Sequence, residues 1–315
     1  MVGRKVGIVG AGFVGATAAY SLAIKGTCHE VILYDINTDV AIGKALDIGQ
    51  STSYAPKGTI VTAAKNASDL KDCDIIVITA GVPRRSDMTR ADLLMINAKI
   101  IKDVVENVVK YSPEAVILCV SNPLDIMNYV VHKMTGWERH RIVGMAGALD
   151  GARMAYQINQ VVGYGSGQIR AMLIGDHGQN MIPMPHISAV GGVPLDQIIS
   201  KEDMEGIIAR TKDGGAEIVK HLGTSAYYAP GRAISVMVEA ILDDSRIVMP
   251  SSVMLDGEYG YKDISVGVPV ILGAKGVHEI IELDLDDELK AKFKISVDSI
   301  REGIDILTEN GFFDS

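Results

Sequence analysis

The 315-residue sequence has few cysteines and no long hydrophobic run. Its three cysteines, Cys28, Cys73 and Cys119, are widely spaced and lie in apolar surroundings, which argues against both a disulfide framework and a zinc site. We therefore expect buried thiols and no bound metal. No segment approaches the roughly 18 consecutive apolar residues that a membrane span needs, so we expect no membrane partner.

Positive charge is also scarce. The chain has 30 Lys and Arg against 39 Asp and Glu, a net charge of −9, and no basic run of the kind that a nucleic-acid partner requires. The apolar start of the chain is interrupted by glycines and lacks a small-residue cleavage pattern, so we expect no signal peptide and a cytoplasmic protein. An acidic protein that binds an anion must gather its positive charge locally.

Short apolar runs alternate with amphipathic stretches through the first half of the chain. Continuous apolar runs indicate strands buried on both faces, and their alternation with helices predicts a Rossmann-type doubly wound parallel sheet, an α/β fold. The expected strands are Val6–Val9, Val31–Tyr34, Ile75–Ile78, Val116–Val120 and Ile142–Val143. The expected helices are Gly15–Ile24, Val40–Gly49, Arg90–Lys110 and Leu124–His132.

The pattern changes beyond about residue 147. The sequence predicts a long helix from about Asp150, a strand over Ala171–Ile174, helices near 202–221 and 230–243, strands over Ile247–Val253 and Asp263–Leu272, and a closing helix over 286–307. No long linker separates the two parts. We therefore divide the chain into a dinucleotide-binding domain, residues 1–146, and a mixed α+β substrate domain, residues 147–315.

A glycine-rich segment follows the first strand and opens the first helix. In this context the first glycine permits a tight turn, the second lets the backbone approach a pyrophosphate, and the third lets helix and strand pack closely. The alternative is an ordinary strand-to-helix turn. The segment is Gly10-Ala11-Gly12-Phe13-Val14-Gly15.

Asp35 ends the second strand, about twenty residues past Gly15. A carboxylate there accepts hydrogen bonds from the adenosine ribose hydroxyls and repels a 2′-phosphate, and the following Ile36 and Asn37 offer no arginine to receive one. The sequence therefore favours NAD over NADP, although Asp35 also suits a plain turn.

His177 lies between glycines directly after the strand that we expect at 171–174. Oxidation of a secondary alcohol needs a base for the hydroxyl proton, and histidine titrates closest to neutral pH. Asp150 and Arg153 lie three residues apart and so share one helix face. The carboxylate suits the orientation of an imidazole, and the guanidinium suits a bidentate grip on a substrate carboxylate. The alternatives are a surface histidine and a helix-surface ion pair.

Positive charge gathers in residues 83–90, where three arginines, Arg84, Arg85 and Arg90, lie within seven residues. A loop at the carboxyl end of a strand overhangs the cofactor in this fold, so these arginines are placed to meet an anion and to polarise a carbonyl. At the end of another strand, Ser121-Asn122-Pro123 places an amide near the same edge. A solvated basic loop and a simple turn asparagine are the alternatives.

Taken together and in this order, these segments resemble the lactate/malate dehydrogenase family, and within it the malate dehydrogenases that are lactate-dehydrogenase-like in sequence. The resemblance covers nearly the whole chain. It rests on GAGFVG, Asp35, TAGVPRRSDMTR, VSNPLD, GMAGALDGAR, GDHG, GTSAYYAP and GEYGYKDISVGVPVILG.

The resemblance implies a role for each matching residue. His177 looks like the proton acceptor and donor, Asp150 its partner, Arg153 the clamp on the C1 carboxylate, and Arg90 the residue that polarises the carbonyl. The segment 83–89 resembles a lid whose closure excludes water. Positions that touch cofactor or substrate in relatives match Asn97, Val120, Ser121 and Asn122.

Arg84 matches the family's specificity position, where glutamine accompanies lactate dehydrogenases and arginine the malate enzymes. A C4 dicarboxylate brings a second negative charge that an arginine satisfies, whereas pyruvate would leave that arginine buried without a partner, at a cost of several kcal/mol. The sequence departs from the usual pattern at Ser86-Asp87, Asp176 and Gln179. Asp87 adds negative charge to the lid, and Asp176 is placed to perturb His177.

We therefore expect reversible NAD-dependent oxidation of (S)-malate to oxaloacetate. Lactate dehydrogenase is the alternative within enzymes, and a non-catalytic NAD-binding sensor is the alternative outside them, although such a sensor is expected to lose part of the histidine, aspartate and arginine set. The resemblance further implies a place in the tricarboxylic acid cycle and a homotetramer or homodimer. Apolar helical faces such as Ala41–Ile48 suit a subunit interface.

Overall fold

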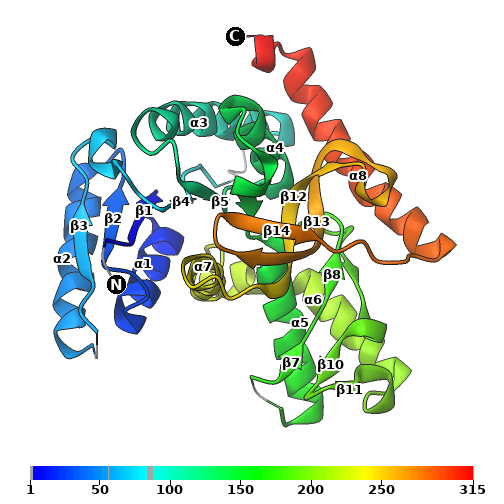
Figure 1. The fold of residues 1–315 in the computed structure, drawn as a ribbon. Helices are drawn as coiled ribbons and strands as arrows, with labels where there is room; N and C mark the ends of the chain where they lie inside the picture. Colours follow the sequence, from blue (N-terminus) through cyan, green and yellow to red (C-terminus); the bar gives the residue numbers. More distant parts are fainter. Residues whose placement is uncertain (1–2, 56, 84–87, 166, 315) are drawn as a thin grey trace.

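One nine-stranded sheet runs through the protein, in the order β14-β13-β12-β6-β5-β4-β1-β2-β3 (Figure 1). The structure is a computed structural model that describes residues 3–55, 57–83, 88–165 and 167–314. The six strands from β6 to β3 pair in parallel, as expected for a doubly wound fold. They are β1 (Lys5–Val9), β2 (Glu30–Tyr34), β3 (Ile60–Ala63), β4 (Ile75–Ile78), β5 (Val116–Cys119) and β6 (Ile142–Gly144).

All five strands expected in this half are present, which confirms the predicted Rossmann-type sheet. The sequence did not predict β3. This strand is at the edge of the sheet, and Ile60 is exposed while the rest of the strand is half-buried, so it lacks the fully apolar run that marks the central strands. The helices that connect the strands are α1 (Phe13–Lys25), α2 (Thr38–Ser51), α3 (Arg90–Tyr111) and α4 (Leu124–Thr135).

The second half of the chain extends the same sheet. The strands β12, β13 and β14 are antiparallel to one another, and Ser252 of β12 pairs with Gly144 of β6. Short strands and α6 pack on α5 to form a smaller layer with its own core. The elements are α5 (Ala146–Val162), β7 (Ile169–Arg170), β8 (Leu173–Ile174), β9 (Ile182–Pro183), β10 (Ala189–Val190), β11 (Val193–Pro194), α6 (Lys201–Leu222), α7 (Tyr228–Leu242), β12 (Ile247–Asp256), β13 (Lys262–Gly273), β14 (Gly276–Ile280) and α8 (Asp287–Glu309).

Two expectations in this half need correction. The helix expected from about Asp150 begins earlier, at Ala146, so that Asp150 lies one turn inside it. The strand expected over Ala171–Ile174 is shorter and covers only Leu173–Ile174. None of the helices in the described parts of the chain is long and apolar enough to cross a membrane.

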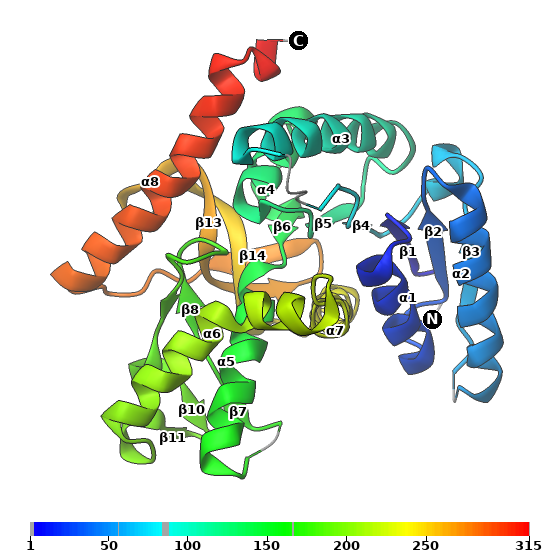
Figure 2. The ribbon, with the colours of Figure 1, turned by 180° about the vertical axis from the view of Figure 1, so that it is seen from behind.

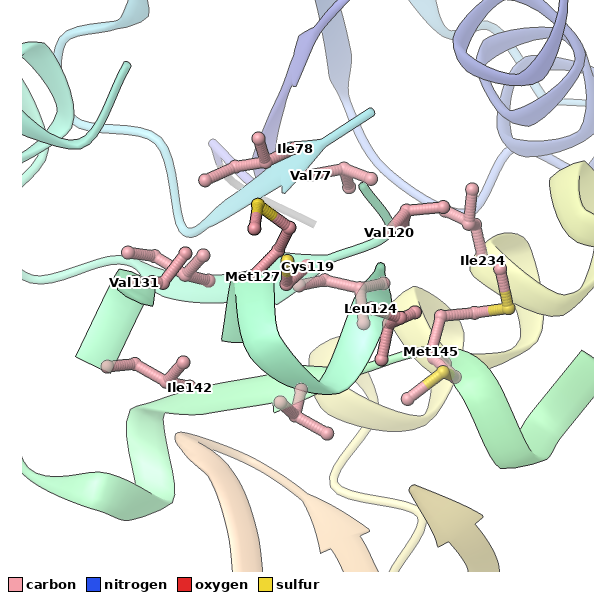
Figure 3. Packing of buried hydrophobic residues seen from close by; sticks show 14 of the residues in the cluster. Val77, Ile78, Cys119, Val120, Leu124, Met127, Val131, Ile142, Met145 and Ile234 are labelled. Carbon is pink, nitrogen blue, oxygen red and sulfur yellow. The ribbon is translucent and has the colours of Figure 1, made fainter. Parts of the chain in front are cut away.

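The main core lies between the central strands and the helices that cover them (Figure 3). All four residues of β4 and all four of β5 are buried, and Leu124, Met127 and Val131 of α4 pack against them. Each fully buried aliphatic side chain of this kind contributes about 1.5–3 kcal/mol. Cys28, Cys73 and Cys119 are buried and unpaired, as predicted, and burial raises the pKa of each thiol to about 12.

Helix α7 packs across α1 and so brings the second half of the chain against the start of the first helix (Figures 1 and 2). A Cβ atom at Gly231 of α7 would lie 2.6 Å from Cγ2 of Thr17, so the glycine permits this close approach. Phe13, the first residue of α1, stacks on Tyr227 directly before α7, with ring centroids 5.1 Å apart. Helices α2 and α8 lie on opposite flanks of the molecule (Figure 2).

Candidate active site

The glycine-rich turn between β1 and α1 has the geometry of a phosphate-binding loop. Gly10 has φ +105°, and a Cβ atom there would lie 2.7 Å from Oγ1 of Thr79. A Cβ atom at Gly15 would lie 1.9 Å from the carbonyl oxygen of Gly10, so no larger residue fits. A Cβ atom at Gly12, by contrast, meets nothing within 4 Å. The open side at Gly12, at the N-terminus of α1, is where a pyrophosphate fits.

Asp35 follows β2 and holds this loop from the side. Its Oδ2 accepts a hydrogen bond from the backbone N–H of Ala11 at 2.7 Å, and its Oδ1 accepts one from Asn37 at 2.9 Å. Each carboxylate oxygen carries two lone pairs, so both retain capacity for ribose hydroxyls. These acceptor oxygens therefore fit the ribose hydroxyls at the adenosine end of NAD.

A cavity of about 340 Å³ opens between the end of β5, α5, α6 and the start of α7. This volume is in the range of small-ligand sites. The cavity brings together five residues that the sequence singled out: Val14, Val120, Asn122, Arg153 and His177. Its other lining residues, which the sequence did not single out one by one, are Leu124, Met145, Leu149, Gly215, Ala216, Val219, Ser225, Ala226 and Pro230.

His177 contacts Asp150, as the family resemblance implied. Nδ1 of His177 lies 2.7 Å from Oδ2 of Asp150, and the side chains are 14% and 3% exposed. Because a carboxylate only accepts hydrogen bonds, Nδ1 carries a proton, and Nε2 is the acceptor of the neutral ring. The pair therefore presents a base to the cavity when neutral and an acid when protonated.

Opposing effects set the pKa of His177. Burial alone would lower it, but the negative charge of Asp150 and its hydrogen bond, together with the charge of Asp125, outweigh burial and raise the pKa. Arg153 acts weakly in the opposite direction. The imidazolium is thus stabilised where it would form on accepting a proton.

Arg153 lies beside this pair in the same cavity. Its Nη1 donates to Oδ1 of Asp150 at 3.2 Å, whereas its buried Nε has no hydrogen-bond partner among the described residues. A Cβ atom at Gly215 of α6 would lie 3.3 Å from Nη2 of Arg153, so this glycine leaves room for the guanidinium. A half-buried guanidinium with an unused donor in a cavity fits a substrate carboxylate.

Asn97 and Ser121 brace the edge of the cavity and are not among its lining residues. Oδ1 of Asn97 accepts from the N–H of Val82 at 2.8 Å, and its Nδ2 donates to the carbonyl of Asn122 at 2.8 Å. The hydroxyl of Ser121 donates to the carbonyl of Ala80. Both side chains therefore hold the segment after β4 against the end of β5.

Of the three arginines in residues 83–90, the structure describes only Arg90. Arg90 is the first residue of α3, is exposed, and does not line the cavity. Arg84 and Arg85 lie outside the described residues, as do Ser86 and Asp87. The carbonyl-polarising role of Arg90 and the specificity role of Arg84 therefore stay predictions.

The departures at Asp176 and Gln179 leave the His177–Asp150 pair intact. Oδ2 of Asp176 accepts from Nδ2 of Asn180 at 3.0 Å, and burial raises the pKa of Asp176. Gln179 is exposed, and its carbonyl accepts from Nζ of Lys212.

The sequence missed a second buried carboxylate behind the histidine. Oδ2 of Asp125, on the first turn of α4, accepts from the backbone N–H of His177 at 2.8 Å. Asp125 belongs to the segment VSNPLD, but only the packing of α4 against the turn at 175–178 shows what its side chain contacts. Burial raises the pKa of Asp125 to about 6, against hydrogen bonds from Ser252 and His177.

A phosphate-binding loop next to a cavity that holds a histidine, its carboxylate partner and a free guanidinium donor defines an NAD-dependent dehydrogenase. Comparison with known proteins gives the family. Residues 4–144 match the model of the lactate/malate dehydrogenase NAD-binding domain, and residues 147–310 match that of the lactate/malate dehydrogenase alpha/beta C-terminal domain. The chain belongs to the lactate/malate dehydrogenase family.

Similar proteins cover almost the whole chain. A malate dehydrogenase of Sulfurimonas denitrificans is 54% identical over 99% of this chain and 98% of its own length. The solved structure of malate dehydrogenase from Salinibacter ruber is 41% identical, with a TM-score of 0.93 over 97% of this chain and 98% of that one. Lactate dehydrogenase from Eimeria maxima, solved with NADH and oxamate, is 35% identical, with a TM-score of 0.91 over 97% and 96% of the two chains.

Proposed function

We propose that this chain catalyses the reversible oxidation of (S)-malate to oxaloacetate with NAD. The observation that carries the proposal is the cavity in which His177, bonded to Asp150, lies beside Arg153. The malate dehydrogenases to which the chain is similar along its whole length support the choice of substrate.

His177 and Asp150 carry out the proton transfer. NAD, when bound, supplies the nicotinamide carbon that exchanges a hydride with the substrate. Neutral His177 takes the hydroxyl proton of malate at Nε2, and Asp150 stabilises the imidazolium that results. In the reverse direction the same imidazolium returns the proton to the carbonyl oxygen of oxaloacetate.

Arg153 holds the substrate. Its unpartnered Nε and the rest of its guanidinium suit the carboxylate at C1, and its bond to Asp150 fixes the guanidinium relative to His177. Asn122 lines the same cavity and offers an amide to the hydroxyl or carbonyl group. Arg84 and Arg90 are proposed to bind the second carboxylate and to polarise the carbonyl, as the family pattern implies.

The experiment compares NADH consumption with oxaloacetate and with pyruvate at matched substrate and salt concentrations. We expect a strong preference for oxaloacetate, and loss of that preference in Arg84→Gln. Arg139→Gln is the matched control because Arg139 pairs with Glu258 outside the cavity. A preference for pyruvate would show that the enzyme is a lactate dehydrogenase, and NADH binding without turnover of either substrate would support the sensor.

Location, pathway and assembly belong to the same proposal. We infer a cytoplasmic enzyme of the tricarboxylic acid cycle that assembles as a homotetramer or homodimer. The support for assembly within the chain is the number of exposed apolar residues on α2 and next to it, Ile36, Val40, Ile42 and Leu46. Light scattering at several protein concentrations measures the assembly directly.

A further inference from the structure

Asp125 is a buried carboxylate that contacts the backbone of His177. It is 4% exposed and uses both of its oxygens. Oδ2 accepts from the N–H of His177 at 2.8 Å, and Oδ1 accepts from the hydroxyl of Ser252 at 2.6 Å. Its position in the first turn of α4, where helix N–H groups point outward, favours a negative charge.

Asp125 is itself fixed by a buried polar network. Ser252 belongs to β12, and its carbonyl accepts from Nδ2 of Asn128 on α4 at 3.1 Å. The same Nδ2 donates to the hydroxyl of Ser265 on β13 at 2.7 Å. Ser252 and Ser265 are fully buried. The network therefore joins α4 of the first half of the chain to two strands of the second half, directly behind the turn that carries His177.

We propose that Asp125 is a positioning residue that fixes the main chain of His177 while Asp150 fixes the ring. Hydrogen bonds then hold both the main chain and the ring of His177, so that Nε2 keeps one position in the cavity. The carboxylate also adds a second negative charge near the ring. The role assigned here rests on the proposed dehydrogenase reaction.

In the part of the chain that the structure describes, the charged groups around His177 lie on three helices and on its own turn. Asp150 and Arg153 face it from α5, Asp125 faces it from α4, and Asp176 precedes it in the turn. Lys212 of α6 bonds to the carbonyl of Gln179. Among these groups, Asp150 and then Asp125 raise the pKa of His177 against burial. Removing the charge of Asp125 should therefore lower that pKa.

The test uses Asp125→Asn and Asp125→Ala in the full-length protein. Asparagine retains an acceptor for the N–H of His177 but no charge, whereas alanine retains neither. Asp74→Asn is the control, because Oδ2 of the exposed Asp74 also accepts from a backbone N–H, that of Lys5 at 2.7 Å, and Asp74 does not line the cavity. Two readouts are measured: kcat and KM for oxaloacetate across pH, and the titration of the His177 ring by NMR, assigned with His177→Asn.

We expect the kcat of Asp125→Asn, at its best pH, to stay within about threefold of the wild-type value. The upper pH midpoint of kcat/KM and the midpoint of the His177 ring titration should both move to lower pH. For Asp125→Ala we expect kcat to fall about 10- to 100-fold with a smaller change in KM, because a displaced base loses its alignment. Asp74→Asn should behave as wild type.

Unchanged midpoints in Asp125→Asn, or wild-type kcat in Asp125→Ala, would overturn the proposal. If Asp125→Ala does not fold, Asp125→Asn decides alone. If the wild type does not reduce oxaloacetate, the proposed function fails, and the ring titration still decides whether Asp125 acts on His177.

Discussion

His177 and Asp150 are 27 positions apart in the sequence, yet Nδ1 of one lies 2.7 Å from Oδ2 of the other. The contact depends on two elements that end at the same cavity, the start of α5 and the turn after β8. Asp150 fixes which ring nitrogen carries the proton, and it stabilises the charged ring.

Asp150→Asn should reduce kcat/KM for oxaloacetate by about two to four orders of magnitude, because the orientation and charge of the partner are both lost. Asp150 raises the pKa of His177, so the variant should lose protonated His177 at lower pH. Oxaloacetate reduction needs the protonated ring and declines as pH rises through its pKa, while malate oxidation rises there. Both midpoints should move to lower pH. Asp176→Asn, whose carboxylate bonds to Asn180, should move them far less, and equal shifts would contradict the assignment.

Arg153→Lys should raise KM for oxaloacetate by about 10- to 100-fold, because a single ammonium replaces a bidentate, charge-assisted grip. The effect on NADH affinity should be small. Steady-state kinetics with oxaloacetate and NADH varied separately distinguish the two. Arg139→Lys is the control, since Arg139 pairs with Glu258 away from the cavity. An unchanged KM would mean that Arg153 does not bind substrate.

Gly12→Ala should weaken NADH binding, whereas Gly15→Ala should lower the stability of the fold. Space at Gly12 is open, so the alanine variant should melt like wild type and bind NADH about 5- to 100-fold more weakly, since the added methyl meets only the cofactor. A Cβ atom at Gly15 collides with the carbonyl of Gly10, so this variant should lose about 3 kcal/mol or more of stability without any ligand. Thermal melts of the apoprotein and NADH fluorescence titrations measure the two effects. Normal NADH binding by Gly12→Ala would place the pyrophosphate elsewhere.

Asp125 should make the free energy of unfolding fall as pH rises, the reverse of the usual effect of a carboxylate. Its pKa in the folded protein is about 6, above the ordinary 3.8, so the folded state binds the proton more tightly. Its contribution is complete below about pH 4 and is lost as pH rises through about 6, a change of about 3 kcal/mol. The free energy of unfolding of wild type minus that of Asp125→Asn should fall by about this amount between pH 4 and pH 7. A difference that stays flat between pH 4 and pH 7 would contradict it.

The sequence predicted the parts of the site that follow from local pattern. Gly10, Gly15 and Asp35 could be found because a tight turn, a close helix approach and a strand-end carboxylate leave regular spacings. His177 and Asp150 could be singled out as chemical groups, but no local pattern shows that they lie within hydrogen-bond distance of each other. The family resemblance supplied that pairing.

Asp125 and the strand β3 show what local pattern does not contain. An aspartate in the first turn of a helix suits solvent as well as a buried network, and only the packing of α4 against β12 and the His177 turn distinguishes the two. Ile60–Ala63 is a strand because β2 offers an edge to pair with, although its own side chains are only partly buried. Both features arise from tertiary contacts between segments far apart in the chain.

The pairing of Ser252 with Gly144 makes the sheet continuous across the two halves of the chain. A rotation of one half of the chain against the other would break this pairing between β6 and β12 and would expose the apolar core beneath the sheet. The shared sheet therefore resists such a rotation. We therefore expect the two halves to unfold together in one transition. We also expect ligand entry to depend on movement of the loops around the cavity, while the sheet itself stays rigid.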